Sequence, residues 1–480
     1  MRKNLDEVKN VLNKYGYSID TIIINVMKKF NFKTICYEAQ ASKKAGYSVV
    51  EIITLMIIFP LMLLKSVNAF YASEFQKISD MKKDVIYRLK NDERMPWRRL
   101  LYGVAKKFKK LVSTENEIAP NSAFIIDDTA DCRVGHKIEN ISIIHDHSSG
   151  KNGSTKFGFK HLFLGLFDGK SIIPLDFSIH KEKELKGKKR KEQYKKECDK
   201  NTNGSKRRKE CRIDKITNAL AMIKRAVKNG FMAKYVLVDS WFTSLDFIKS
   251  IREIKNGAIH VIAGIKNDKR KYDYKGEKLN GKQLIEKLKL ENKQKRCRKW
   301  NTRYFEVEVN YEGIGIVKLC ICRFPYQKKW RIFISTDVSL SFSEIMERYS
   351  VRWTIEVMFK ELKQHLQFGK CQSRDFDAQI SSVTISLILY IFLSYFRRIN
   401  AYETLGGLFE YIKDEMLEKN LAQRLWELFD ELLQLVIDVV SKSGKVDISS
   451  FRGVPEYQYL KDLFESSFLC NQIIDVNNAT

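Results

Sequence analysis

Three acidic residues occupy positions that are typical of catalytic or metal-binding carboxylates. Asp127 follows the apolar run Phe124-Ile125-Ile126, Asp239 follows Tyr235-Val236-Leu237-Val238, and Glu356 lies in a segment with helical spacing. An ionised carboxylate at the end of a buried strand costs free energy unless it is exposed, paired or bound to a metal. In open α/β sheets, sites also form at the carboxyl ends of strands. A turn-forming or helix-capping aspartate is the alternative at both strand ends.

Glu356 shares its segment with other polar residues at regular spacing. At about 100° per helical residue, Tyr349, Arg352, Glu356 and Lys363 lie within roughly a 60° arc and form one stripe. Lys360 flanks this stripe. One interpretation is a solvated face with i,i+4 ion pairs, Arg352–Glu356 and Glu356–Lys360. The other is a functional stripe, which a tyrosine beside the basic residues favours.

Hydrophobic patterning places the first two acids in a mixed α/β region. Residues 161–167 and 171–179 have strand patterns and are joined by Asp168-Gly169, which is typical of two-residue hairpins. Strands are also predicted at residues 123–127, 235–239 and 259–265, and helices at 216–228 and 245–254. This order of elements predicts a mixed sheet with helices packed on it.

The next part of the chain should consist of a β insertion and then helices. Residues 267–335 are expected to be mostly β, with antiparallel strands at 304–309, 314–323 and 330–335. A helix from about 343 to 367 carries the polar stripe, and a long apolar helix follows around 379–398. In the acidic region 401–480, helices are predicted at 405–419 and 423–440, and dimerisation is a candidate role.

The N-terminal region, residues 1–115, is predicted to be helical and basic, with helices at 20–30, 48–70 and 84–109. It is either a small DNA-binding module or a helical cap on the main domain. The basic segment 181–215 is expected to be mostly an exposed loop. It could follow flanking DNA, or it could be a solvated loop with non-specific phosphate contacts.

The charge of the chain indicates its class of partner. The 480 residues carry a net charge of +28, but residues 401–480 are net −7, so residues 1–400 carry +35. Such an excess favours a large polyanion, and nucleic acid is the expected one. A lysine-rich proteome is the alternative explanation.

Cysteine usage and hydropathy further limit the class of protein that this sequence can encode. The nine cysteines are scattered and include no C-x2-C pair, which argues for a reduced cytosolic protein without a disulfide framework or zinc ribbon. The sequence does not open with a signal-peptide pattern, and the apolar runs 52–64 and 385–396 are too short to cross a bilayer. We therefore expect buried helices there and no membrane association.

These residues carry a resemblance to a known family. Tyr349-x2-Arg352-x3-Glu356-x6-Lys363 resembles the Y-R-E-K signature of DDE insertion-sequence transposases of the insertion sequence 4 group. Ile126-Asp127-Asp128-Thr129 is similar to the first catalytic motif of that family, usually Asp-x-Thr/Ser. Val238-Asp239-Ser240-Trp241-Phe242 is similar to the second. The resemblance covers about residues 120–400.

The resemblance implies an RNase H-like mixed-sheet core with a β insertion before the glutamate helix. It also implies that Asp127, Asp239 and Glu356 are catalytic and bind two Mg²⁺ ions, for which Mn²⁺ could substitute. Asp127 and Asp128 are adjacent and face opposite ways on a strand, so only one should reach the metal. The family pattern favours Asp127, and Asp128 is kept as the alternative.

The resemblance further implies DNA-binding residues. Tyr349, Arg352 and Lys363 would hold phosphates beside the scissile bond, with Lys360 beside them. Relatives use an aromatic residue of the insertion to receive a flipped base, and Trp330 is a candidate, with core packing as the alternative.

The expected function is cut-and-paste DNA transposition in the cytoplasm of a bacterium or archaeon, in association with the nucleoid. The expected partners are double-stranded DNA, both terminal inverted repeats and target, and a second copy of the chain in a homodimeric DNA complex. The alternatives are a catalytically inactive, transposase-derived DNA-binding protein and a simple Mg²⁺-dependent endonuclease.

Overall fold

The computed structural model describes residues 25–43, 45–61, 64, 66–73, 79–113, 118–146, 154–182, 193–325, 327–400 and 408. Residues 28–60 and 64–405 belong to one compact unit, which contains the sheet and the helices around it. The helices predicted at 405–419 and 423–440 fall almost wholly outside the described residues, so they stay predictions.

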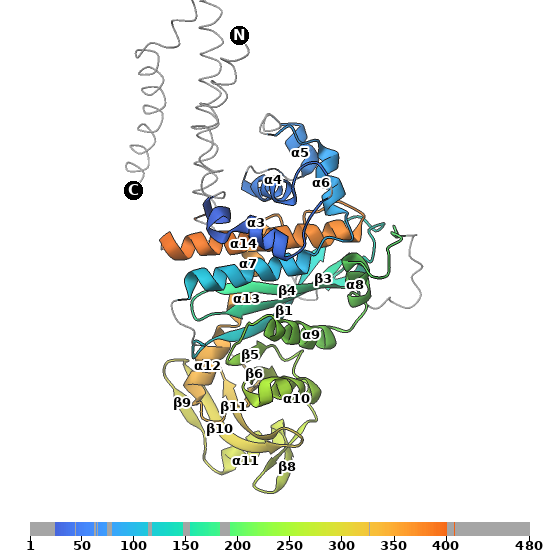
Figure 1. The fold of residues 1–480 in the computed structure, drawn as a ribbon. Helices are drawn as coiled ribbons and strands as arrows, with labels where there is room; N and C mark the ends of the chain where they lie inside the picture. Colours follow the sequence, from blue (N-terminus) through green and yellow to red (C-terminus); the bar gives the residue numbers. More distant parts are fainter. Residues whose placement is uncertain are drawn as a thin grey trace, which may run out of the picture. The chain divides into compact units, whose positions relative to one another are not determined.

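Twelve strands of the described chain form one mixed sheet (Figure 1). The order is β2-β3-β1-β5-β6-β12-β11-β10-β7-β8, with β4 beside β3 and β9 beside β10. At its centre, β1 pairs antiparallel with β3 and parallel with β5, which pairs parallel with β6. The strands are β1 (Ala123–Cys132), β2 (Ser142–Asp146), β3 (Ser154–Phe167), β4 (Ile172–His180), β5 (Tyr235–Val238), β6 (His260–Ile265), β7 (Lys271–Tyr274), β8 (Glu277–Asn280), β9 (Lys295–Cys297), β10 (Thr302–Tyr311), β11 (Gly315–Arg323) and β12 (Arg331–Ser335).

Helices cover both faces of the central strands. On one face, α13 packs on β1 and β4, and on the other α9 and α10 pack on β3, β4 and β6. Each carries an apolar stripe toward the sheet, such as Phe247, Ile248 and Ile251 of α10. The helices after the N-terminal region are α8 (Asn203–Glu210), α9 (Lys215–Lys228), α10 (Leu245–Glu253), α11 (Gly281–Leu290), α12 (Phe342–Ser350), α13 (Trp353–Gln364) and α14 (Phe376–Asn400), with a short 3-10 turn, η2 (Ile254–Gly257), after α10.

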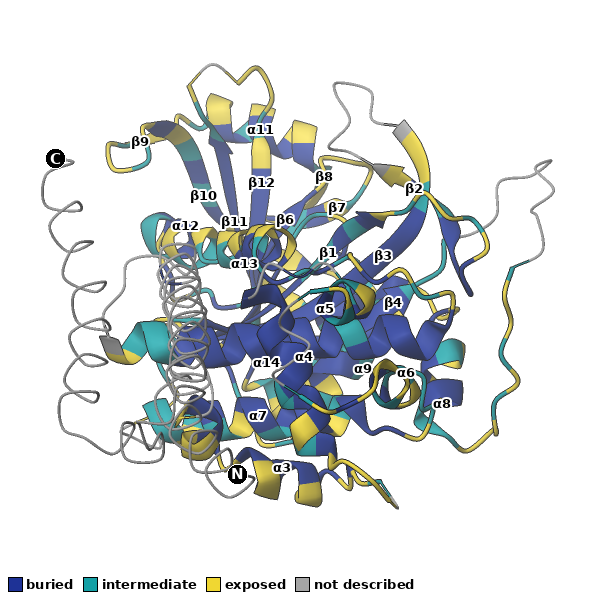
Figure 2. Ribbon diagram, turned by 90° about the horizontal axis from the view of Figure 1, so that it is seen from above, coloured by how far each residue is buried: buried dark blue, intermediate teal, exposed yellow. Residues whose placement is uncertain are grey.

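The apolar helix α14 has 25 residues, more than the run 385–396 suggested. By length and composition its segment Phe376–Ile399 could cross a membrane, but 94% of its most apolar window is buried inside the structure. Figure 2 shows α14 dark blue along most of its length. Its packing against α6, α7 and α13 accounts for the apolar composition, as expected of a core helix.

The described N-terminal helices pack on this unit as a cap. They are α3 (Phe32–Glu38), α4 (Val49–Leu61), α5 (Val67–Tyr71), α6 (Lys83–Lys90) and α7 (Trp97–Val112). Helix α7 contacts α3, α14 and β4, and Phe108 packs its ring on Tyr395. The single helices predicted at 48–70 and 84–109 are each two helices. Pro60 lies near the end of α4, and Pro96 immediately precedes α7, because proline lacks the N–H that a helix interior needs.

The hairpin of β3 and β4 is confirmed, but its loop is longer than the two residues predicted. Phe167 pairs with Ile172, which leaves four residues between the strands. Asp168 Oδ1 accepts hydrogen bonds from the backbone N–H groups of Lys170 and Ser171. Gly169 has φ +100°, a conformation that glycine adopts without strain. The aspartate side chain thus fixes a wider turn than the Asp-Gly pair suggested.

The β insertion is not a separate sheet. Its last strand, β12, pairs antiparallel with β6, so β7 to β12 extend the central sheet. It also contains a helix, α11, which begins with a capping box between Asn280 and Gln283. The three predicted strands are present as β10, β11 and β12.

The basic segment 181–215 is more ordered than the predicted exposed loop. Its described part contains α8, in which Arg207 and Glu210 are buried. The sequence pattern did not predict α8, because this lysine-rich segment has no apolar stripe at helical spacing. Residues 183–192 of the segment lie outside the described residues.

A buried ion-pair network holds α7, α8, α9 and β4 together. Asp176 of β4 is fully buried and lies 2.9 Å from Arg98 Nε and 2.8 Å from Arg225 Nε. Glu210 accepts from Arg98, Arg207 and Arg225 at 2.7 to 3.1 Å. Burial alone would raise the pKa of both carboxyl groups, but the arginines outweigh it and hold each pKa below its ordinary value.

We predict that Arg98→Met lowers the free energy of unfolding by about 3 kcal/mol, because it leaves buried carboxylates short of a partner. The ordinary pKa values of these carboxyl groups are 3.8 and 4.5, and the folded values are lower. The network therefore stabilises the fold fully above these values and loses its contribution as the pH falls through the folded-state values. Urea denaturation at pH 7 and pH 3 measures both effects.

The matched control is Arg94→Met. Among the described residues, the Arg94 side chain forms a local ion pair with Asp92 and is 74% exposed, so little change is expected. Equal destabilisation by the two substitutions would contradict the structural role of the network.

Candidate active site

The parallel pairing of β1 and β5 brings the first two acids to one edge of the sheet. Ile125 pairs with Leu237, and Asp127 and Asp239 each follow two residues later. β5 ends at Val238, one residue short of the predicted strand 235–239, whereas β1 continues through Asp127 to Cys132. The prediction that Asp127 ends its strand was wrong because the longer strand β3 pairs with β1 along its whole length.

The adjacent aspartates of β1 face opposite sides of the sheet. Asp127 Oδ2 lies 2.6 Å from Arg352 Nη1, on the side of α13. Asp128 Oδ2 lies 2.7 Å from Lys215 Nζ, at the start of α9, and Lys215 also pairs with Glu182 at 2.8 Å. Of the two alternatives, the structure therefore places Asp127 on the side of the polar stripe and Asp128 in a separate ion-pair cluster.

The helix predicted to carry the polar stripe is two helices. α12 ends at Ser350 and α13 begins at Trp353, and the residues between them form i→i−3 backbone hydrogen bonds, such as Arg352 N–H to the Tyr349 carbonyl at 3.0 Å. The backbone at Val351 and Arg352 stays in the right-handed helical region. This tight turn redirects the chain without separating the stripe residues.

Arg352 joins two of the three acids. Its Nη1 donates to Asp127 Oδ2, and its Nη2 donates to Glu356 Oε1, both at 2.6 Å. The side chains of Arg352, Asp127 and Glu356 are only 16%, 16% and 32% exposed. The Arg352–Glu356 ion pair of the solvated-face interpretation is thus present. It is half-buried, however, and Arg352 also contacts Asp127 of β1.

Tyr349 completes the same cluster. Its ring packs edge-on against Phe333 at 4.9 Å, and the Arg352 guanidinium lies 5.9 Å from the ring centroid. Burial raises the pKa of Tyr349, and the nearby Asp239 and Asp127 carboxylates raise it further. Gly264 of β6 lies beside this side chain, and a Cβ there would lie 3.4 Å from the tyrosine oxygen, an ordinary contact distance.

The two lysines of α13 differ in position. Lys363 Nζ lies 2.7 Å from Thr129 Oγ1, two residues beyond Asp127 on the same face of β1. Lys360 is exposed on the outer side of the helix. Lys363 therefore lies beside the acid cluster, while Lys360 faces solvent.

Trp330 lies at the same edge of the sheet as Asp239, because β12 begins beside the carboxyl end of β6. The indole is half-buried, packs on Phe305 at 5.1 Å and is covered by the Arg323 guanidinium at 5.1 Å. These contacts correspond to core packing, the alternative role that the sequence suggested for Trp330. Base stacking by Trp330 stays a prediction.

The surroundings of Asp127 perturb its titration. Burial raises the pKa of Asp127 to about 7 despite the opposing charge of Arg352, and the neighbouring carboxylates of Asp239 and Asp128 add to the rise. A cation between Asp127 and Asp239 would relieve this repulsion, and carboxylate oxygens are the ligands that hard divalent cations prefer. The donor set thus fits such a cation, which Asp127, Asp239 and Glu356 would hold.

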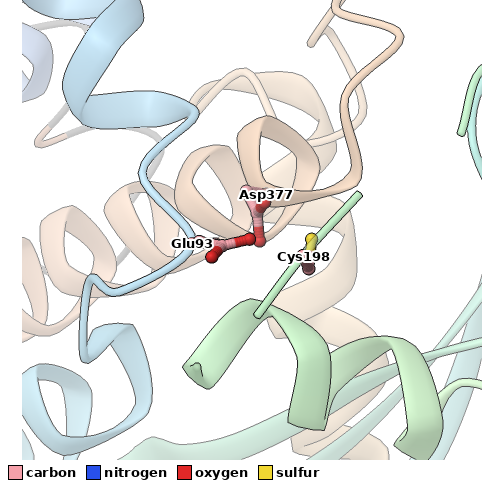
Figure 3. Close-up of side chains that lie close together, drawn as sticks. All are labelled: Glu93, Cys198 and Asp377. Carbon is pink, nitrogen blue, oxygen red and sulfur yellow. The ribbon is translucent and has the colours of Figure 1, made fainter. Parts of the chain in front are cut away.

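Another group of acidic side chains lies apart from this site. Among the described residues, three possible ligand atoms lie within 4.8 Å of one another at Glu93, Cys198 and Asp377 (Figure 3). Both oxygens of Asp377 are already paired, with Arg208 and Lys196 at 2.9 Å each. Burial raises the pKa of the Cys198 thiol to about 12, so the thiol is neutral at pH 7. We therefore interpret the group as an ion-pair cluster that anchors the segment before α8.

Sequence reasoning missed three residues of the acid cluster and its surroundings. They are Thr129, which contacts Lys363, Lys215, which neutralises Asp128, and Gly264, which lies beside the Tyr349 hydroxyl. The Asp-x-Thr pattern could have singled out Thr129. Nothing local to the chain signals the other two, because their partners are 87 and 85 positions away.

Family models match two overlapping parts of the sequence. A model described as "Transposase DDE domain" matches residues 211–392, which include Asp239 and Glu356. A model described as "DDE superfamily endonuclease" matches residues 76–284, which include Asp127 and Asp239. The chain carries a DDE transposase domain. This domain is a DNA phosphoryl transferase that works with a divalent metal ion, so DNA is its substrate. No curated protein matches the sequence significantly.

We predict that Asp127→Asn abolishes DNA cleavage by the DDE domain and that Asp128→Asn does not. The first substitution removes a charged oxygen ligand from the acid cluster, whereas the second leaves Lys215 paired with Glu182. A cleavage assay on labelled duplex DNA with Mg²⁺ compares the two isosteric variants. Loss of activity in Asp128→Asn alone would reverse the assignment.

Proposed function

We propose that this DDE transposase performs cut-and-paste transposition of its own element and belongs to the insertion sequence 4 group. The observation that carries the proposal is the gathering of Tyr349, Arg352, Glu356 and Lys363 around the edge where β1 and β5 present Asp127 and Asp239. A stripe of phosphate-binding side chains next to metal-binding carboxylates suits an enzyme that holds a DNA end through several reactions.

The strand order supports an RNase H-like core. We assign β4-β3-β1-β5-β6 to it, with β3 antiparallel to β1 and with β5 and β6 parallel to β1. In this assignment Asp127 lies in the middle of the central strand β1, Asp239 directly follows its parallel neighbour β5, and Glu356 lies on a helix covering one face. Strands β7 to β12 belong to the insertion, and β2 pairs with β3 at the other end of the sheet.

Each side chain has a role in phosphoryl transfer. Two Mg²⁺ ions, or Mn²⁺ in their place, would supply charge stabilisation for the attacking and leaving oxygens of an in-line displacement. Asp127, Asp239 and Glu356 would hold the ions. Arg352 binds a phosphate through two N–H groups, and Lys363 binds one as a point charge.

The same site serves cleavage and joining. Water is the attacking group when the element end is cut, and the 3′-hydroxyl of that end attacks during hairpin formation and strand transfer. In each step one P–O bond forms and another breaks, so no covalent enzyme intermediate is needed. The net charge of +35 on residues 1–400 supports binding of both terminal repeats and target DNA in the nucleoid, with two copies of the chain pairing the ends.

A simple metal-dependent endonuclease is the second candidate, because one of the two matching family models is an endonuclease. Such an enzyme would cut DNA but would not join a 3′-hydroxyl end to a target. A strand-transfer assay with pre-cleaved ends separates the two functions. Inverted repeats flanking the reading frame would favour transposition.

We predict that Glu356→Gln abolishes excision and strand transfer but leaves DNA binding largely intact. The substitution replaces a charged carboxylate of the proposed metal site with a neutral amide. It removes none of the phosphate-binding cations. Excision from a donor plasmid and gel-shift binding measure the two effects. Glu347→Gln is the matched control, since Glu347 lies on α12 and pairs at the surface with Lys299. Near-normal excision by Glu356→Gln would contradict the proposal.

We predict that Lys363→Ala weakens binding of pre-cleaved ends and reduces the slope of log affinity against log salt by about 1, because one phosphate contact is lost. Lys363→Arg keeps the charge and should keep the slope. Fluorescence anisotropy titrations between low and high salt give both values. An unchanged slope in Lys363→Ala would count against the phosphate role.

A further inference from the structure

Arg352 holds oxygen atoms that the proposed metal ions would need. Its two terminal nitrogens each lie 2.6 Å from a carboxylate oxygen, one on Asp127 and one on Glu356. These distances are typical of charge-assisted hydrogen bonds. Because all three side chains are at most about one third exposed, with 32% the largest value, water weakens the contacts only in part.

A guanidinium and a divalent cation compete for these oxygens. Both are positively charged and both need carboxylate lone pairs. Arginine keeps its proton in proteins, so Arg352 cannot relieve the conflict by becoming neutral. A metal bound between Asp127 and Glu356 would thus repel the guanidinium, and the side chain would have to move.

The local structure allows this movement. Arg352 lies in the tight turn between α12 and α13 and is not packed in a helix interior. The guanidinium carbon also lies 5.9 Å from the centroid of the Tyr349 ring, over its face. A DNA phosphate beside the metal would offer two oxygens to the same planar set of donors.

We infer that Arg352 is an internal counter-ion that exchanges the Asp127 and Glu356 carboxylates for a DNA phosphate when the divalent metal binds. This inference rests on the proposed function, because the metal and the phosphate are those of its reaction. The exchange couples the two ligands. Metal binding releases the guanidinium for DNA, and a bound phosphate keeps the guanidinium away from the metal ligands.

The coupling has a consequence for the order of events. Without DNA, Arg352 competes for two metal ligands and weakens metal binding. With DNA, the competitor is removed and the full affinity of the carboxylates is available. The enzyme would therefore assemble its metal site mainly on DNA, which limits metal-dependent chemistry in the free protein.

The test measures Mn²⁺ binding to the full-length protein without DNA, by the electron paramagnetic resonance signal of free Mn²⁺. Arg352→Gln removes the competing charge, so we expect it to bind Mn²⁺ about tenfold more tightly than the unmodified chain. Arg352→Lys keeps a cation and should bind less tightly than Arg352→Gln. Circular dichroism verifies that both variants are folded.

The matched control is Arg348→Gln. Arg348 lies one turn earlier, on α12, and pairs with Glu344 instead of the acid cluster. The control removes the same charge from the same region, so its Mn²⁺ affinity should stay near that of the unmodified chain. Equal or weaker Mn²⁺ binding by Arg352→Gln would overturn the exchange, and so would equal tightening by Arg348→Gln or by Arg352→Lys.

Asp127→Asn separates this inference from the proposed function. If the unmodified chain binds no Mn²⁺, or if Asp127→Asn binds it equally well, the metal site itself is wrong and the proposed function fails. If Asp127→Asn loses binding but Arg352→Gln leaves the affinity unchanged, the metal site stands and only the exchange is refuted.

Discussion

The repulsion among carboxylates at one edge of the sheet is the constraint on which the site depends. Asp127 and Asp239 are brought together by the parallel register of β1 and β5, and Glu356 approaches from α13. Burial of such charges is unfavourable unless cations neutralise them. Arg352 supplies one cation by contacting Asp127 and Glu356, and divalent metal is the other cation that this donor set suits. The same residues thus explain both how the fold tolerates the acids and how the site would use them.

The rest of the unit keeps this edge in place. The network around Asp176 and Glu210 ties the N-terminal helix α7 to β4, α8 and α9. The buried helix α14 packs beside α13, which carries Glu356. The described N-terminal helices are therefore structurally part of the catalytic unit, whatever contacts they also make with DNA. A rigid scaffold of this kind matters because the proposed two-metal chemistry would need its carboxylates in fixed positions.

Several local elements could be predicted from the sequence. Helices α9 and α10 and strands β5, β6 and β11 match the predicted segments closely, because each has a regular hydrophobic period. Other elements could not be predicted. Helix α8 was missed because its lysine-rich composition has no apolar stripe. The predicted helix 84–109 is interrupted before Pro96. Strand β1 continues past Asp127 because it pairs with β3, a contact that no local pattern predicts.

For the candidate site, the residue types and their spacing are visible in the sequence: three acids in order and a polar stripe around Glu356. These are local properties, since strand and helix periods act over a few residues. The packing of the folded chain sets the contacts, in which Asp127 faces Arg352, Asp128 faces Lys215 and Lys363 reaches Thr129. Arg352 and Asp127 are 225 positions apart in the chain. Their contact depends on sheet register and on the turn between α12 and α13, which no short stretch of sequence specifies.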